Sequence, residues 1–281
     1  MYNEKEQLKL SLRRIRDNEY SLEECENINE YVNLMLKYIG DNDPELRDEL
    51  IYSTFANWIE GKCYFTDEEL KNLLNTILSD EFIFYKIGSE DDDSVLRRSF
   101  SILLVDPILC RHLDKEFLDE EMILRTKDCL LRFFNEEKDL RGYDKEKGWV
   151  HAIAHAADGV HALINCKGIT KDICKEIMTA IENKMLEGKE IFSSEEDERI
   201  VVIIYNDIIL DKLLSDQYVC NWIEGLSKFS EIKNKMTRFK AKVNIKNLMR
   251  SLYFRLLHLE NNDEISKSII ELEKKLNSYL N

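Results

Sequence analysis

Residues that interrupt helices are scarce in this chain, and that scarcity is the strongest constraint on its fold. Among 281 residues there are two prolines and nine glycines. Leu, Ile, Glu, Lys and Asn are abundant, and no alternating Val/Thr-rich run is typical of a strand. Proline and glycine are the residues that most strongly break helices. The sequence therefore predicts an all-α fold made of long helices with few breaks.

Helix start signals recur along the whole chain. Three Ser/Thr-x-x-Glu pairs have the spacing of a capping box, and one Asp-Pro pair resembles an N-cap followed by proline. These signals are Ser21 with Glu24, Thr66 with Glu69, Ser193 with Glu196, and Asp43-Pro44. Apolar residues follow each of them at helical spacing. We predict about twelve helices, near residues 3–17, 21–39, 44–60, 67–79, 94–111, 117–135, 147–164, 171–187, 195–214, 216–228, 232–258 and 263–279.

These helices are predicted to form a single domain, residues 1–281, as a HEAT-like α-α superhelix of helix pairs. Neither of the two likeliest loops, residues 88–93 and 136–147, resembles an interdomain linker. A short internal echo supports repeated helix pairs, because residues 57–61 and 221–225 both read Asn-Trp-Ile-Glu-Gly. In each copy the glycine is typical of a helix end. The repeated sequence predicts that the same αα-hairpin occurs twice in the fold, as in helical-repeat proteins.

Cysteine usage and hydropathy indicate a soluble, cytoplasmic protein. The seven cysteines are scattered and never spaced as Cys-x-x-Cys, which argues against a disulfide framework or a thiolate metal site. The amino-terminal segment is charged and amphipathic, unlike a signal peptide. The most apolar stretch, residues 200–210, is far shorter than the roughly 20 residues that cross a bilayer. We therefore expect no membrane span.

Charge is unevenly distributed along the chain. The net charge of −15 disfavours general affinity for nucleic acid. Residues 228–255 nevertheless contain nine Lys and Arg residues and one acid, Glu231. This basic segment could bind an anionic polymer, but charge runs are more often solvated faces that pair with acidic residues elsewhere. Nucleic acid is therefore an unfavoured partner.

The composition changes sharply in the segment 139–166. Asp158 is the only formal charge in residues 149–166, and the segment contains His151, His155 and His161. A helix with so few charges is expected to be buried, and its polar groups then need partners. On a helix over 147–164, His151, His155 and Asp158 share one narrow face, whereas His161 points away from it. That face is predicted to line a cleft or a buried network.

Three interpretations of this face remain open. His151, His155 and Asp158 could ligate one metal ion, or they could act with Asp139 as catalytic acids and bases. They could equally form a satisfied structural network. A zincin-type peptidase is excluded, because Ala152 stands where that motif needs its general base. No cofactor can be assigned.

Candidate ligand-binding residues lie before and beside the same helix. They are Arg98, Ser99, Arg141, Tyr143 and Trp149. A guanidinium such as that of Arg141 can clamp a carboxylate or a phosphate. The alternative, which we favour slightly, is that Arg141 pairs with Asp139 or Asp158 and fixes the turn.

Several of these residues fall in motifs that resemble a known family. The motifs are Arg-Ser-Phe at 98–100, Glu-Lys-Asp-Leu-Arg-Gly-Tyr at 137–143 and Lys-Gly-Trp-Val-His-Ala at 147–152, with Ala-His at 154–155 and Ala-Asp at 157–158. They are similar to the signature of the bacterial family DUF2785, most clearly over residues 95–165. The resemblance implies an all-helical, cytosolic bacterial protein. It implies no reaction, cofactor or active site.

Three functional hypotheses follow from the sequence. The first is a helical-repeat binding or scaffold protein with a polar His/Asp cleft and a protein or peptide partner. The second is a metal-dependent or acid/base enzyme that uses the His151, His155 and Asp158 cleft. The third is anionic-polymer binding through residues 228–255, which the overall acidity disfavours.

Overall fold

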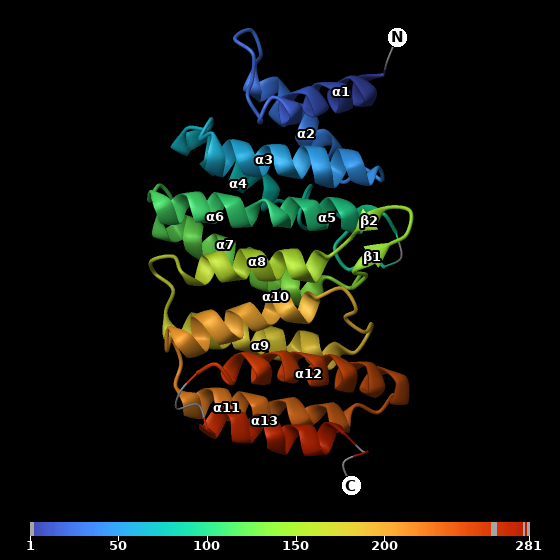
Figure 1. Cartoon of the computed structure of the whole chain (residues 1–281), viewed down its shortest axis with the longest axis vertical. Coiled ribbons are helices and arrows are strands. Elements are labelled where there is room, and N and C mark those ends of the chain that lie inside the picture. Colours follow the sequence, from blue (N-terminus) through green and yellow to red (C-terminus); the bar gives the residue numbers. More distant parts are fainter. Residues whose placement is uncertain (1–2, 91, 260–262, 278, 280–281) are drawn as a thin grey trace.

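Helices stack in layers along the long axis of the molecule, from the amino-terminal to the carboxyl-terminal end (Figure 1). The structure is a computed structural model and describes residues 3–90, 92–259, 263–277 and 279. Successive layers follow the order of the sequence. The predicted all-α class is confirmed.

The α-helices are α1 (Glu4–Asp17), α2 (Ile28–Tyr38), α3 (Ser53–Ala56), α4 (Asp67–Ile77), α5 (Ser94–Leu103), α6 (Val105–Asp114), α7 (Glu120–Glu136), α8 (Ala152–Ile164), α9 (Lys171–Glu187), α10 (Glu196–Val202), α11 (Asp216–Gly225), α12 (Lys235–Leu256) and α13 (Asp263–Leu276). Three segments have wider π-helical turns, namely η1 (Glu45–Tyr52), η2 (Asn57–Gly61) and η3 (Ile203–Leu210). A 3₁₀ segment, η4 (Leu226–Glu231), follows α11. Among the described residues, no helix combines the length and the apolar character that a membrane span requires.

The predicted helix from 21 to 39 is wrong at its start. Helix α2 begins at Ile28, where the Asn27 side chain accepts a hydrogen bond from the backbone N–H of Asn29. The preceding segment is held instead by the Glu26 carboxylate, which accepts from the Tyr31 hydroxyl and from Arg14 of α1. That ion pair keeps residues 21–27 outside the helix. By contrast, the predicted capping box at the start of α4 is present.

The Ser193 and Glu196 pair does not form a capping box. Helix α10 begins at Glu196, after Glu195 in the left-handed region with φ of 66°. The Glu196 carboxylate accepts from the backbone N–H of Ser194, two residues earlier. The N-cap position is therefore Glu195 rather than Ser193, and no side chain caps the helix there.

The predicted helix from 147 to 164 is also wrong at its start, because α8 begins only at Ala152. Gly148 and His151 both have positive φ, of 74° and 46°, which a right-handed helix cannot accommodate. The preceding residues form a short antiparallel hairpin of β1 (Tyr143–Asp144) and β2 (Gly148–Trp149). No alternating pattern in the sequence indicated these strands.

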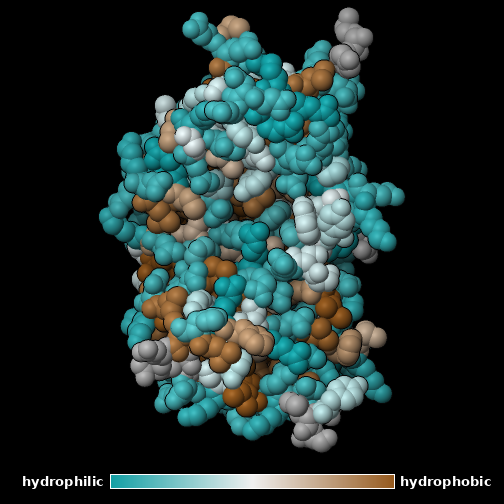
Figure 2. All heavy atoms as spheres, in the orientation of Figure 1, coloured by the Kyte–Doolittle hydropathy of each residue, from teal (hydrophilic) through white to brown (hydrophobic). Residues whose placement is uncertain are grey.

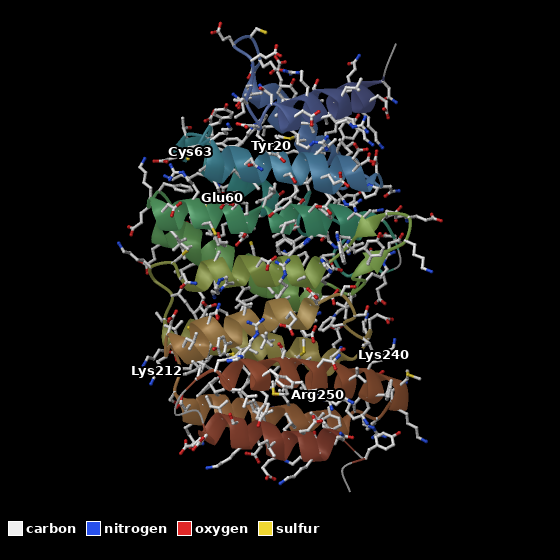
Figure 3. All side chains as sticks on the ribbon, viewed as in Figure 1. Tyr20, Glu60, Cys63, Lys212, Lys240 and Arg250 are labelled. Carbon is white, nitrogen blue, oxygen red and sulfur yellow. The ribbon has the colours of Figure 1, made fainter. Side chains whose placement is uncertain are left out.

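The two Asn-Trp-Ile-Glu-Gly copies have the same structural role in different layers. The indole of Trp58 donates to the backbone carbonyl of Tyr20 at 2.9 Å, and that of Trp222 donates to the carbonyl of Met178 at 2.8 Å. Both rings are buried. Tyr20 lies between the first helices and the layer that contains α3 (Figure 3). Each tryptophan therefore fastens its own helix end to a neighbouring layer.

Helix α8 lies in the interior of the stack. It packs against α5, α6, α7 and α10, and nearly all its residues are buried. Its alanines and Gly159 allow this, because a Cβ at Gly159 would lie 3.2 Å from a Leu130 methyl carbon. Hydrophilic residues, in contrast, cover much of the outer face (Figure 2). The polar residues of α8 are thus exceptions in a largely apolar environment.

A fully buried ion pair marks the point where the chain leaves α7. The guanidinium of Arg98 donates to both carboxylate oxygens of Glu137, at 2.6 and 2.8 Å. It also donates to the Ser94 hydroxyl at 2.7 Å. The Glu137 carboxylate accepts in turn from the backbone N–H groups of Lys138 and Asp139, both at 2.9 Å. The pair therefore fixes the direction of the non-helical segment that follows.

Replacing Glu137 by Gln should lower the free energy of unfolding by about 3–5 kcal/mol, because Arg98 would remain charged and buried without a counter-ion. The neighbouring Glu136 provides a matched control, since its partner Arg132 is about half exposed. Glu136→Gln should change stability by less than about 1 kcal/mol. Urea denaturation followed by circular dichroism measures both values. Equal losses in the two variants would contradict this role for the buried pair.

Candidate functional site

A cleft of about 750 Å³ opens beside the middle of the stack. Its walls come from η1, the junction of α5 and α6, the hairpin, α8 and the start of α10. The polar and aromatic side chains that line it are Asp48, Tyr52, Asp106, Tyr143, Trp149, His151, His155, Asp158, His161, Ser193, Ser194, Glu195 and Arg199. Five of the residues proposed from the sequence are in this set, namely Tyr143, Trp149, His151, His155 and Asp158.

A buried arginine holds the hairpin at the rim of the cleft. The Arg47 guanidinium donates to the backbone carbonyls of Asp41 at 2.6 Å and Trp149 at 3.0 Å, and also to that of Lys147. It lies over the Phe100 ring, 4.6 Å from the centroid. All three hydrogen bonds go to main-chain oxygens, so Arg47 fixes the path of the backbone rather than the charge of the cleft.

His151 has the most unusual conformation in the site. It is left-handed, with φ of 46° and ψ of 28°, and its backbone N–H donates to the carbonyl of Gly142. Non-glycine residues in this region are strained and often functional. The imidazole stacks on Trp149 with a centroid distance of 4.3 Å and an interplanar angle of 24°. The strained backbone thus presents both rings at the cleft.

The buried side of the His151 ring faces Glu196. Nε2 of His151 lies 3.7 Å from Oε1 of Glu196, and both atoms are buried without a hydrogen-bond partner among the described residues. Burial lowers the pKa of His151 and raises that of Glu196. Buried polar atoms are almost always satisfied, so this unsatisfied pair directly behind the cleft is an exception.

His155 is a structural residue at the back of the cleft. Its Nδ1 lies 2.8 Å from the hydroxyl of Ser99, which donates its one proton to the backbone carbonyl of Val150. The imidazole must therefore donate from Nδ1 to the Ser99 oxygen. Burial, followed by the charge of His151, lowers the pKa of His155 to about 3. The ring is thus neutral and ties α8 to α5 and the hairpin.

Two carboxylates lie close enough to influence each other in the cleft. Asp158 accepts from Nη1 of Arg199 through both oxygens at 2.8 Å. Asp106 forms no ion pair among the described residues, and its only side-chain hydrogen bond there comes from the Cys110 thiol at 3.8 Å. Burial, assisted by the negative charge of Asp158, raises the pKa of Asp106 to about 6. Burial also raises the pKa of Asp158, although Arg199 opposes that shift.

His161 lines the cleft, although its position around the predicted helix placed it away from the face of His151, His155 and Asp158. Its Nδ1 lies 2.8 Å from Oδ2 of Asp207, the acid that interrupts the apolar stretch of η3. This hydrogen bond raises the pKa of His161. The pair explains why a buried aspartate is tolerated there. When His161 is protonated, the two side chains form a salt bridge.

Several proposed site residues lie outside the cleft lining. Arg98 forms an ion pair with Glu137, and Ser99 lies behind His155. Arg141 pairs with Asp139, with Nη2 2.6 Å from Oδ2, and also donates to the carbonyl of Asp92 at 2.9 Å. This geometry matches the turn-fixing alternative. Asp139, which is almost fully buried, is likewise occupied by Arg141.

The three predicted metal ligands do not converge. His151 lies outside the helix, so the spacing that predicted a common face with His155 and Asp158 does not apply. The two imidazoles meet edge to face with centroids 5.7 Å apart, and the Asp158 oxygens face Arg199. In the described ranges, no three His, Cys, Asp or Glu side chains are placed to hold one metal ion.

Sequence reasoning missed several cleft residues, among them Asp48, Tyr52, Asp106 and Arg199, and it also missed the acid behind His151. Asp48 and Tyr52 stand four residues apart, a spacing that puts them on one face of a helix. Asp106 is the only charged residue in the apolar run 99–110, and that signal could have identified it. The fourth residue, Arg199, and Glu196 lie in a charged stretch that gave no compositional signal.

The protein family described as "Protein of unknown function (DUF2785)" matches residues 83–254. The chain belongs to this family. No curated protein and no solved structure matches it. The region shared with DUF2785 contains most of the cleft, whereas Asp48 and Tyr52 of η1 lie before it.

Four of the nine basic residues in the segment 228–255 pair with acids. Lys228 pairs with Glu182, Lys240 with Glu190, Arg250 with Glu273 and Arg255 with Glu198, at 2.7 to 3.0 Å. Lys240 and Arg250 are labelled on α12 in Figure 3. These pairs fit the interpretation of the segment as a solvated face with acidic neighbours.

Asp106→Asn should stabilise the protein at neutral pH. The folded state raises the pKa of Asp106 from 3.8 to about 6, so ionisation above pH 6 costs folding free energy that an amide does not cost. We expect a gain on the order of 2 kcal/mol at pH 7.5, falling to roughly half at pH 5, because pH 5 lies within the window between the unfolded and folded pKa values over which the penalty develops. Urea denaturation at both pH values measures the gain.

The control for this experiment is Glu24→Gln, which removes one charge from an exposed loop. It should leave stability nearly unchanged at both pH values. An Asp106→Asn variant that is less stable than the parent at pH 7.5 would show that the carboxylate supports the fold.

Proposed function

We propose that this protein binds a small polar molecule in the cleft between η1, the hairpin, α8 and α10. The observation that carries the proposal is the convergence of ionisable side chains from separate segments on one cavity. A volume of about 750 Å³ lies within the usual range for ligand pockets, roughly 300–1,000 Å³. Perturbed pKa values in a cleft are typical of functional sites.

A purely structural network accounts less well for these side chains. Such a network normally satisfies its buried polar atoms, whereas His151 Nε2 and Glu196 Oε1 have no partner among the described residues. Asp106 is kept in a position that disfavours its charge. Two aromatic side chains at the rim, Tyr143 and Trp149, are 55% and 42% exposed. A bound molecule would cover the rings and compensate the carboxylate of Asp106, which lines the cleft.

The broader setting of this binding function is also a proposal. We propose a single domain built from HEAT-like helix pairs, supported by the equivalent roles of Trp58 and Trp222. A cytoplasmic location is supported by the seven cysteines, all of which are free thiols. Binding is placed in the cleft rather than on the outer helical surface, because the perturbed ionisable groups gather there.

Acid/base catalysis in the same cleft is a second candidate function. Asp106 supports it, because a pKa near 6 suits a group that exchanges a proton at neutral pH. The neighbouring Asp158 is held by Arg199, so two carboxylates in one cleft have different environments. Such a difference is typical of acid and base pairs.

Blocking the cleft should remove a bound small molecule. Ser193 is exposed and lines the rim, so Ser193→Trp should obstruct entry without disturbing the core. Untagged wild type and variant, gently purified from the same host, are heated to release small molecules, which are compared by mass spectrometry. We expect at least one compound enriched with the wild type. Identical release from both proteins would contradict the proposal.

A matched control and a catalytic assay complete the experiment. Ser227→Trp is the control, because Ser227 lies in η4 and outside the cleft lining. It should retain the compound. Incubating the released compound with fresh wild type and with Asp106→Asn tests the second candidate, since only catalysis predicts a time-dependent change in its mass that the variant loses.

A further inference from the structure

We propose that the ligand of the cleft is a small organic cation carrying an amine or guanidinium group. This inference rests on the proposed binding function and specifies the chemical class of its ligand. It depends on three features of the cleft. In the described part of the chain, the cleft has carboxylates without a counter-ion, it has aromatic rings at its rim, and its acidic groups are too dispersed to form a metal site.

The carboxylates of the cleft outnumber its available cations. Arg199 is bound to Asp158 through both carboxylate oxygens, and His161 is bound to Asp207. Asp48 of η1 and Asp106 of α6 form no ion pair among the described residues. An anionic ligand would meet these acids without a free counter-charge. A neutral ligand would bury them without compensation, which is unfavourable.

The rim adds aromatic surface that suits a cation. Trp149 is held by its stacking on His151 and by an edge-to-face contact with Tyr143, whose ring centroid is 4.9 Å away. Aromatic rings attract ammonium and guanidinium groups through their electron-rich faces. Both rings are substantially exposed, although large apolar residues elsewhere in the chain are mostly buried.

The separation of the acidic groups favours an organic cation over a metal ion. No three His, Cys, Asp or Glu side chains of the described residues can share one metal ion. A metal ion needs several ligands at one point, whereas an organic cation can contact carboxylates at different positions and place its carbon atoms against the rings.

Small linear probes of similar length and different charge test the proposal. They are butane-1,4-diamine, butane-1,4-diol and butanedioate, with 4-aminobutylguanidine as a second cation. Tryptophan fluorescence reports entry into the cleft, because Trp149 is exposed whereas Trp58 and Trp222 are buried. Isothermal titration calorimetry gives the dissociation constants. We expect at least one cation to bind about tenfold more tightly than the diol, and butanedioate to bind most weakly.

Variants locate the binding site. Asp48→Asn and Asp106→Asn should each weaken binding of the cation by about tenfold or more, whereas the exposed-loop control Glu24→Gln should not. Trp149→Phe should abolish the fluorescence change and retain binding by calorimetry. Circular dichroism checks that each variant is folded.

The outcomes separate this inference from the proposed function. If the diol or the dianion binds as tightly as the cations and the cleft variants weaken it, the cation class is wrong and the cleft still binds a ligand. If cation binding is equally strong in Asp48→Asn, Asp106→Asn and Glu24→Gln, binding is a general surface effect and the cation proposal is overturned. If no cation binds more tightly than the diol, the proposal is also overturned.

Discussion

Two buried guanidinium groups hold the non-helical segment that forms one wall of the cleft. Arg98 and its partner Glu137 fix the point where the chain leaves α7, and Arg47 fixes the hairpin that follows. Arg47 donates only to main-chain carbonyls, so it supplies hydrogen bonds that a helix would otherwise provide internally. This anchoring allows residues 137–151 to form one wall of the cleft within a stack of helices.

Several groups around the cleft lower the stability of the fold, and that loss supports a functional interpretation. His151 is in a left-handed conformation, its Nε2 lacks a hydrogen-bond partner in the described structure, and Asp106 is held where its charge is disfavoured. Each feature opposes folding, whereas the surrounding helices pack small and apolar residues around α8. Local conflicts gathered at one cavity are typical of binding and catalytic sites, and they support the proposed function.

The sequence predicts the helices well and the cleft only in part. Helical spacing and few glycines and prolines suffice for the all-α class, because each helix needs only a local apolar pattern. The composition of residues 149–166 identifies α8 as buried and selects His151 and Asp158. It cannot show that His151 is left-handed, because that conformation depends on Gly142 and on the hairpin held by Arg47. The metal hypothesis relied on a continuous helix through His151 and loses its geometric basis for that reason.

Tertiary contacts determine which other residues line the cleft. Asp48, Asp106 and Arg199 are far apart in the sequence and meet only because η1, α6 and α10 surround the same space. Arg98 carries the local signal of a ligand-binding residue, yet long-range pairing with Glu137 makes it structural. A buried arginine and a site arginine have the same appearance in a single sequence, and only the position of the counter-ion distinguishes them.

Hydrogen exchange in Arg47→Met tests most directly whether buried guanidinium groups hold the wall of the cleft. Methionine keeps apolar contact with Phe100 and removes the hydrogen bonds to the hairpin. The backbone N–H groups of Val150 and His151, which donate to Gly142, should exchange about tenfold faster or more, while residues 156–164 of α8 keep their protection. Unchanged exchange at Val150 and His151, or an equal loss of protection throughout α8, would contradict the account.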